Sequence, residues 1–179
     1  MLLSPVEIAR AGRFHFDADR ERWTRAHSAL RTILAGYTGV APLELAFLPG
    51  EHGKPALDPG NCGGRNVHFN LSHAGEWAFV AVSREVPVGI DVERIRDRVD
   101  IAALLRRLGE GDFPADRESC FQRWARREAK SKAAGGPLMA PVSEEALWSD
   151  LEAAPGYAAA VALLGHPPRP EYRSEKTPE

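Results

Sequence analysis

The residues Val-Gly-Ile-Asp-Val-Glu at 88–93 constrain the fold most, because apolar side chains alternate there with small or acidic ones. This period of two is typical of a half-buried β-strand. A strand places residues i and i+2 on one face, so the Cα atoms of Asp91 and Glu93 should lie roughly 6–7 Å apart. Two neighbouring carboxylates repel each other unless a positive group lies between them. The segment therefore predicts a strand that has a cationic partner.

A second constraint is a stripe of side chains in the segment 121–132. Phe121, Trp124, Ala125, Glu128 and Lys132 recur at i, i+3, i+4, i+7 and i+11, which places them on one face of a helix. One interpretation of its polar end is an exposed i, i+4 ion pair worth about 0.2–0.5 kcal/mol. The other is that Glu128 joins the two strand carboxylates around a divalent cation.

The donor chemistry indicates which cation such a site would take. Three carboxylates without His or Cys form an oxygen-only set, which suits Mg²⁺, or Mn²⁺, rather than Zn²⁺. Mg²⁺ held by a few carboxylates usually takes waters and substrate phosphate oxygens as its other ligands. We therefore expect a phosphate-bearing substrate.

Two further segments supply candidate phosphate-binding groups. Gly-Lys-Pro at 53–55 presents Lys54 on a turn, and Asn-Leu-Ser-His at 70–73 places the hydroxyl of Ser72 beside the imidazole of His73. Exposed lysines in turns are common, and a lone His is more often structural. The adjacent Ser and His, without a nearby Asp, also make a poor hydrolase triad. As phosphate ligands they need no such alignment.

Hydrophobic spacing predicts an α+β order of elements. A long helix is expected at 19–37, capped by Asp17 or Asp19 and followed by Gly39. A longer helix should run from about 114 to 134 and end at Gly-Gly-Pro. The other expected elements are strands at 44–48, 54–57, 67–72, 77–83, 88–93 and 157–164 and a helix at 101–108.

An internal similarity appears when the chain is shifted by 80 residues. Residues 71–82 then lie over residues 151–162, with Leu71 on Leu151 and Trp77 on Tyr157. The alternative to a true repeat is chance similarity. As a repeat, it predicts two similar α+β halves, 1–85 and 86–165, in a pseudo-twofold arrangement with the active site at their interface. The tail, 166–179, holds four prolines and many charges and is expected to be extended or disordered.

Composition excludes several classes of protein. The net charge of −2 gives no overall basic field for nucleic acid, although arginines cluster locally. Cys62 and Cys120 belong to no metal-ligand pattern, and two reduced cysteines in a cytoplasmic protein are the simpler account, with a disulfide as the alternative. The first residues are too quickly polar for a signal peptide, and no apolar run approaches the ~20 residues that span a bilayer. We expect a cytoplasmic protein.

Four ordered motifs together resemble a known family. Gly-Lys-Pro at 53–55, Asn-Leu-Ser-His at 70–73, Gly-Ile-Asp-Val-Glu at 89–93 and Trp-Ala-Arg-Arg-Glu-Ala-Lys-Ser-Lys at 124–132 resemble the 4′-phosphopantetheinyl transferase superfamily. The match is to the pseudo-dimeric type that modifies carrier proteins of polyketide and non-ribosomal peptide synthesis. It covers roughly residues 15–164. One departure is Arg127, where the family has Lys. The chain is also short at its C-terminal end for this type.

The resemblance implies the reaction and a role for each matched residue. The 4′-phosphopantetheine arm of coenzyme A passes to a serine of an acyl or peptidyl carrier protein, and adenosine 3′,5′-bisphosphate leaves. Mg²⁺ is the expected cofactor, with Mn²⁺ as an alternative, and the chain is expected to be a monomer. The metal ligands would be Asp91, Glu93 and Glu128; the catalytic residues Glu128 and Lys132; and the coenzyme A contacts Arg31, Lys54, Pro55, Ser72, His73 and Lys132.

Other functions compete with this interpretation. A catalytically silent homologue would bind coenzyme A or a carrier protein without transfer. A Mg²⁺-dependent nucleotide phosphohydrolase would use water in place of the serine. The sequence leaves open whether Glu128 or a water that it orients is the base, which carrier is used and whether acylated coenzyme A is accepted.

Overall fold

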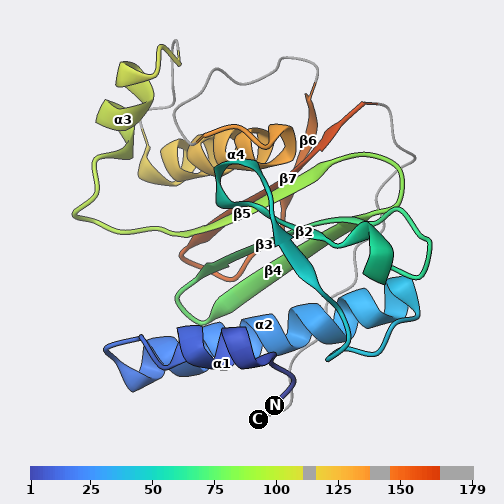
Figure 1. The fold of residues 1–179 in the computed structure, drawn as a ribbon. Helices are drawn as coiled ribbons and strands as arrows, with labels where there is room; N and C mark the ends of the chain where they lie inside the picture. Colours follow the sequence, from blue (N-terminus) through green and yellow to red (C-terminus); the bar gives the residue numbers. More distant parts are fainter. Residues whose placement is uncertain (111–115, 138–145, 166–179) are drawn as a thin grey trace.

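The computed structural model describes residues 1–110, 116–137 and 146–165 of the chain. These residues form an α+β fold in which two helix-and-strand units lie against each other (Figure 1). The α-helices are α1 (Pro5–Ala11), α2 (Asp17–Thr38), α3 (Ile101–Arg107) and α4 (Arg117–Ala134). The strands are β1 (Phe47–Pro49), β2 (Pro55–Leu57), β3 (His68–Ala74), β4 (Trp77–Ser83), β5 (Val88–Arg94), β6 (Ala146–Leu151) and β7 (Tyr157–Leu164).

The N-terminal unit packs helix α2 against two antiparallel hairpins, β1–β2 and β3–β4. Leu30 and Leu34, one turn apart on α2, are almost fully buried and share a core with Phe69 of β3. Helix α2 ends at Gly39, whose left-handed backbone (φ 75°) lets its N–H reach the carbonyl of Ala35. This unit thus has a hydrophobic core of its own.

The C-terminal unit is a three-stranded antiparallel sheet, in the order β5–β7–β6, covered on one face by α4 (Figure 1). The contact is built from small side chains. Ala125, Ala129 and Ala133 recur every fourth residue along α4 and are at most 2% exposed. Alternate alanines of β7, beginning with Ala158 and Ala160, belong to the same core. Small residues on both surfaces let the helix backbone approach the sheet closely.

The two units meet where β3 lies beside β5. Side-chain hydrogen bonds take the place of a regular backbone ladder between β3 and β5. Asn70 Oδ1 accepts the N–H of Ile90 at 2.8 Å, and Ser72 Oγ accepts that of Val92 at 3.3 Å. A small core of Ala81, Val88, Ile90 and Val161 continues across the junction. We call this junction of β3, β5 and α4 the seam.

Most predicted elements are confirmed, and the α+β class with them. Helix α2, strand β4 and the end of α4 lie where the sequence indicated, and β7 has the predicted bounds. The predicted cap of α2 was wrong: its N-cap is Phe16, which makes no side-chain cap, and Asp17 and Asp19 lie in the first turn. Positions 114 and 115 and the tail 166–179 lie outside the described residues.

The similarity at a shift of 80 has a structural counterpart in two hairpins. Strand β4 begins at Trp77 and strand β7 at Tyr157, and each follows an antiparallel partner, β3 or β6. The turns differ, since two residues join β3 to β4 and five join β6 to β7. The pseudo-twofold relation between the halves, and their boundary at residue 85, stay predictions.

Candidate active site

The acidic face of β5 is turned toward helix α4. Gly89, Asp91 and Glu93 alternate on this face, as the period of two predicts. A Cβ atom on Gly89 would meet the carbonyl oxygen of Ala129 at 2.1 Å and the nitrogen of Ala133 at 2.4 Å. Gly89 is thus the position at which helix and strand backbones touch, and this contact sets the height of α4 above the carboxylates.

Asp91 lies at the centre of the seam with partners from both units. Its Oδ1 accepts a hydrogen bond from Ser72 Oγ at 3.0 Å and pairs with Lys132 Nζ at 2.6 Å. Lys132 Nζ also contacts Ser72 Oγ at 3.2 Å and the carbonyl of Ile90 at 3.3 Å. The side chain of Asp91 is only 5% exposed. Three predicted residues from β3, β5 and α4 are therefore brought together.

Glu93 and Glu128 flank this centre. Glu93 accepts a hydrogen bond from the indole N–H of Trp124 at 3.2 Å and lies 3.8 Å from Arg96. Burial, and then the charge of Asp91, raise the pKa of both Glu93 and Glu128, and for Glu128 it reaches about 7. The interpretation of Glu128 and Lys132 as an exposed pair is wrong, because Glu128 is 3% exposed and the ammonium of Lys132 pairs with Asp91.

The carboxylates have the chemistry of a divalent cation site. Two of their oxygens, Asp91 Oδ2 and Glu128 Oε1, are buried without a hydrogen-bond partner in the part of the chain that the structure describes. Buried carboxylate oxygens normally have a donor or a cation, so these two fit a metal. No three His, Cys, Asp or Glu side chains of the described residues already form a metal-holding group. The three-ligand set of Asp91, Glu93 and Glu128 stays a prediction.

The other predicted coenzyme A contacts lie around the seam at different depths. His73 follows Ser72 on β3; partial desolvation of its ring, and then the charge of Lys132, lower the pKa of His73. Pro55 begins β2 and is exposed. Lys54, just before it, is turned inward, with its ammonium on the carbonyls of Val88 and Lys132.

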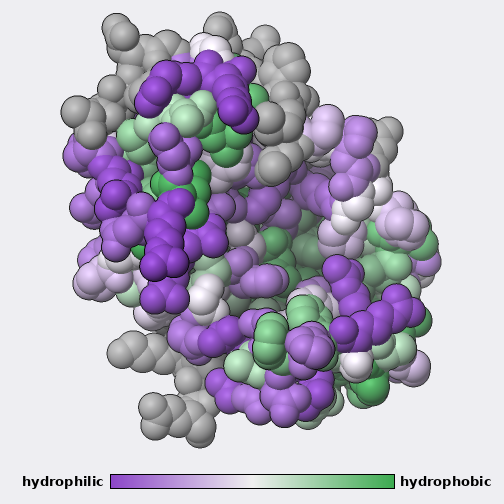
Figure 2. All heavy atoms as spheres, turned by 90° about the vertical axis from the view of Figure 1, so that its left-hand side faces the viewer, coloured by the Kyte–Doolittle hydropathy of each residue, from purple (hydrophilic) through white to green (hydrophobic). Residues whose placement is uncertain are grey.

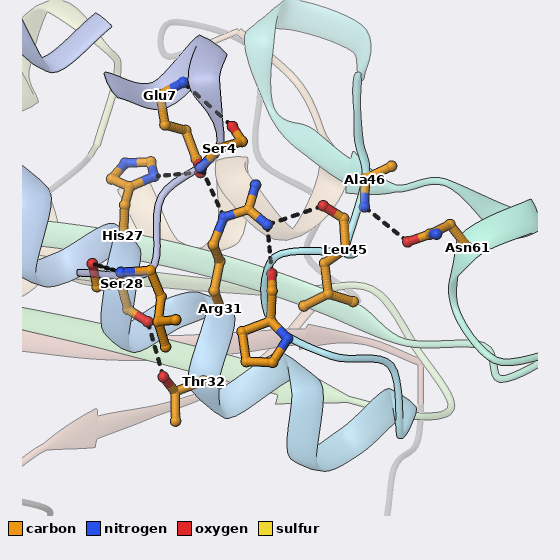
Figure 3. A network of polar contacts seen from close by, with 11 residues as sticks. Ser4, Glu7, His27, Ser28, Arg31, Thr32, Leu45, Ala46 and Asn61 are labelled. Carbon is orange, nitrogen blue, oxygen red and sulfur yellow. Dashed lines mark hydrogen bonds and ion pairs between the residues drawn. The ribbon is translucent and has the colours of Figure 1, made fainter. Parts of the chain in front are cut away.

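Arg31 is not brought to the seam. Its guanidinium is 2% exposed and pairs with Glu7 of α1 at 2.7 Å (Figure 3). It also donates to the carbonyls of Pro42, at 2.6 Å, and Leu45, at 3.0 Å. His27 lies on the other side of Glu7, at 3.7 Å. These contacts tie α1 and the segment after α2 to the long helix, and they do not support a phosphate contact by Arg31.

The sequence interpretation missed two elements and two polar partners. Helix α1 had a visible signal, since Ser4 and Glu7 form a reciprocal capping box around Pro5. Strand β6 carries only weak alternation. Asn70 begins the motif at 70–73, but its bond to Ile90 has no local signature, and neither has the Glu110–Arg127 ion pair of 2.6 Å, because the partners are distant in the chain. Arg127, the departure from the family motif, is 7% exposed, and its acidic partner Glu110 is partly buried.

One face of the molecule is hollowed between its two units. Figure 2 shows this face, which lies at the left of Figure 1, with hydrophilic side chains above and below the hollow and apolar ones inside it. The segment from the end of β5 through α3 lies on the same side in Figure 1, and its exposed arginines are Arg94, Arg96, Arg98, Arg106 and Arg107. Fold and seam together define an α+β protein with one polar centre shared by two units.

Comparison with known proteins places this architecture in a family. The pattern described as 4′-phosphopantetheinyl transferase, N-terminal, matches residues 1–85. The chain is 32% identical over 195 residues to the 4′-phosphopantetheinyl transferase HetI of Nostoc sp., which covers 95% of this chain and 82% of that protein. It is 30% identical over 129 residues to the 4′-phosphopantetheinyl transferase gsp of Aneurinibacillus migulanus, covering 68% of this chain and 50% of the relative. It is 27% identical over 94 residues to the 4′-phosphopantetheinyl transferase Sfp of Bacillus subtilis, covering 52% of this chain and 40% of Sfp.

The chain belongs to the 4′-phosphopantetheinyl transferase family. The resemblance carried by the four motifs is thereby confirmed. The chain spans most of HetI but only about half the length of gsp. None of the described helices is long and apolar enough to cross a membrane.

Proposed function

We propose that this chain transfers the 4′-phosphopantetheine arm of coenzyme A to a serine hydroxyl of an acyl or peptidyl carrier protein. The observation that carries the proposal is the meeting of Ser72, Asp91 and Lys132 at the seam, in a chain of this family. The serine oxygen forms a bond to the phosphorus that bears pantetheine. The bond from that phosphorus to the bridging pyrophosphate oxygen breaks, and adenosine 3′,5′-bisphosphate leaves.

Asp91, Glu93 and Glu128 would hold Mg²⁺, or Mn²⁺, which supplies charge neutralisation at the pyrophosphate when bound. Among the described residues, no donor meets the buried oxygens Asp91 Oδ2 and Glu128 Oε1, which supports the assignment. Lys132 lies against Asp91 and Ser72, where its ammonium would stabilise charge on the transferring and leaving oxygens. Ser72 and His73 would contact the phosphates of coenzyme A.

Glu128 is the candidate base for the carrier serine. Without a metal, burial and the charge of Asp91 raise the pKa of Glu128 to about 7, and a bound cation would lower this pKa. Glu128 takes the proton itself or through a water that it orients. A metal-bound carboxylate is a weaker base. The two routes predict different turnover rates for Glu128→Asp, because the shorter side chain of Asp reaches less far toward the serine hydroxyl.

The exposed arginines between β5 and α4 would dock the carrier protein. Carrier proteins are typically acidic, and complementary charge guides association. Reversing Arg106 and Arg107 to Glu should raise the KM for carrier by about tenfold, with the KM for coenzyme A within about twofold. Unchanged carrier kinetics would exclude this docking surface.

Release of adenosine 3′,5′-bisphosphate, measured by chromatography with and without apo carrier, tests the proposed reaction. The transferase requires carrier for release. A phosphohydrolase would release the bisphosphate from coenzyme A alone, and a silent homologue would bind coenzyme A without release in either case. We also propose that the chain acts in the cytoplasm and as a monomer; this experiment tests neither property.

A further inference from the structure

The turn before β2 fixes the backbone of Lys54. Gly50 donates its N–H to the carbonyl of Lys54 at 2.9 Å, and a Cβ on Gly50 would meet that oxygen at 2.1 Å. His52 and Gly53, with φ of 53° and 83°, both have left-handed backbones. The hydrogen bond from Gly50 and these two backbone conformations set the direction in which Lys54 leaves the turn.

The ammonium of Lys54 crosses from the N-terminal unit to the C-terminal unit. Its Nζ donates to the carbonyl of Val88, the first residue of β5, at 2.9 Å. It also donates to the carbonyl of Lys132, in the last turn of α4, at 2.6 Å. The side chain is partly buried, and this burial lowers the pKa of Lys54. One cation thus joins a strand and a helix that both belong to the other unit.

The position of the second carbonyl matters, because it belongs to the residue that reaches the polar centre. Lys132 projects its own ammonium onto Asp91 and Ser72. Its carbonyl lies at the helix C-terminus and also accepts the N–H of Gly135 at 3.3 Å. A cation near a helix C-terminus stabilises the last turn through the helix dipole and the free carbonyls. Lys54 therefore bonds the backbone that carries Lys132.

We propose that Lys54 is a positioning residue, which holds the last turn of α4 against β5 so that Lys132 reaches the transferring phosphate. This inference rests on the proposed transfer function. It differs from the expectation that Lys54 grips the nucleotide, because the ammonium of Lys54 donates to two protein carbonyls. Its removal should reduce turnover while nucleotide affinity stays the same.

The test is the kinetic comparison of Lys54→Met with the unmodified chain, joined to two readouts that need no turnover. We expect kcat for carrier loading to fall by about tenfold or more, because loosening the helix end misplaces Lys132. The KM for coenzyme A and the Kd for adenosine 3′,5′-bisphosphate, by calorimetry, should stay within about twofold. Amide exchange of residues 133–136 should rise about tenfold, because the last helical turn loses its bond to Lys54.

Two matched variants complete the test. Lys54→Arg keeps a cation with several donors and should retain kcat within about threefold. Arg65→Met removes a comparable contact, since Arg65 donates to the carbonyl of Tyr37 near the end of α2 at 2.9 Å, and should leave kcat unchanged. If Lys54→Met does not fold, Lys54→Arg decides, and a tenfold loss of kcat in Lys54→Arg overturns the proposal.

A tenfold weaker Kd for the bisphosphate in Lys54→Met overturns the proposal in favour of a phosphate ligand, whatever happens to kcat. Unchanged kcat overturns it as well. Absence of loading by the unmodified chain would refute the proposed function instead. The exchange measurement would then still test Lys54, and unchanged exchange at 133–136 would overturn its assignment.

Discussion

Gly89 allows the sharpest test of how the fold positions the site. In Gly89→Ala the new methyl group would lie 2.1 Å from the carbonyl oxygen of Ala129 and 2.4 Å from the nitrogen of Ala133. Both atoms belong to the helix backbone, so no side-chain rotation relieves the contact. Helix α4 must retreat by roughly 1 Å, and overpacking of this kind costs about 1–3 kcal/mol.

The same displacement acts on the chemistry, because α4 carries both Glu128 and Lys132. A misplacement of about 1 Å commonly reduces turnover by about a hundredfold. We therefore expect Gly89→Ala to lower the free energy of unfolding by about 1–3 kcal/mol in urea and kcat for carrier loading by about a hundredfold. The loss in kcat should persist at temperatures where the variant remains fully folded.

Gly36→Ala is the matched control. Gly36 lies inside α2, and a Cβ there would have no atom within 4 Å. Alanine in a helix is about 0.5–1 kcal/mol more favourable than glycine, so this variant should be slightly more stable and fully active. Wild-type stability and turnover in Gly89→Ala would refute the idea that close backbone contact sets the height of α4.

Three further predictions follow from the charges. Because the folded state holds the pKa of Glu128 near 7, above its unfolded value, the contribution of Glu128 to the stability of the metal-free chain should be lost as pH rises from about 4.5 to 7. The difference in free energy of unfolding between the chain and Glu128→Gln, from urea titrations, should change over this pH range, and a difference that is independent of pH would contradict the assignment. Lys132→Met should lower the free energy of unfolding by about 3 kcal/mol, because Asp91 stays buried without its cation, and full stability in the variant would count against this pair. Arg31→Met should lower the free energy of unfolding by about 3–5 kcal/mol, because it leaves the carboxylate of Glu7 without its cation. The Kd for adenosine 3′,5′-bisphosphate should stay within about twofold, and a weaker Kd with unchanged stability would favour a phosphate contact by Arg31.

The local patterns of this chain predict its elements well, because each rests on neighbours in sequence. The alternation at 88–93 indicated β5 and the face shared by Asp91 and Glu93. The helical stripe from Phe121 to Lys132 indicated which side of α4 is buried, and Phe121 and Ala125 are fully buried. Helix α1 could also have been predicted from its capping box.

What sequence spacing could not predict are partners that only the fold brings together. Lys132 neighbours Glu128 along the helix, yet its ammonium reaches Asp91, 41 positions earlier. Lys54 follows the turn that Gly-Lys-Pro suggested, but its ammonium donates to backbone carbonyls, which no side-chain motif records. Arg31 was predicted to contact a phosphate, but in the structure its guanidinium pairs with Glu7. Such pairings depend on the packing of α1, α2 and the seam.

The most direct test of the central claim is intact-mass spectrometry of an apo carrier protein incubated with this chain, coenzyme A and Mg²⁺. A Glu128→Gln variant and a chelator-treated sample serve as controls. The account predicts a mass gain of one phosphopantetheine arm that requires both the metal and Glu128. No gain on fatty-acid, polyketide or peptide carriers, despite measurable binding of coenzyme A, would contradict it and favour a silent binding protein.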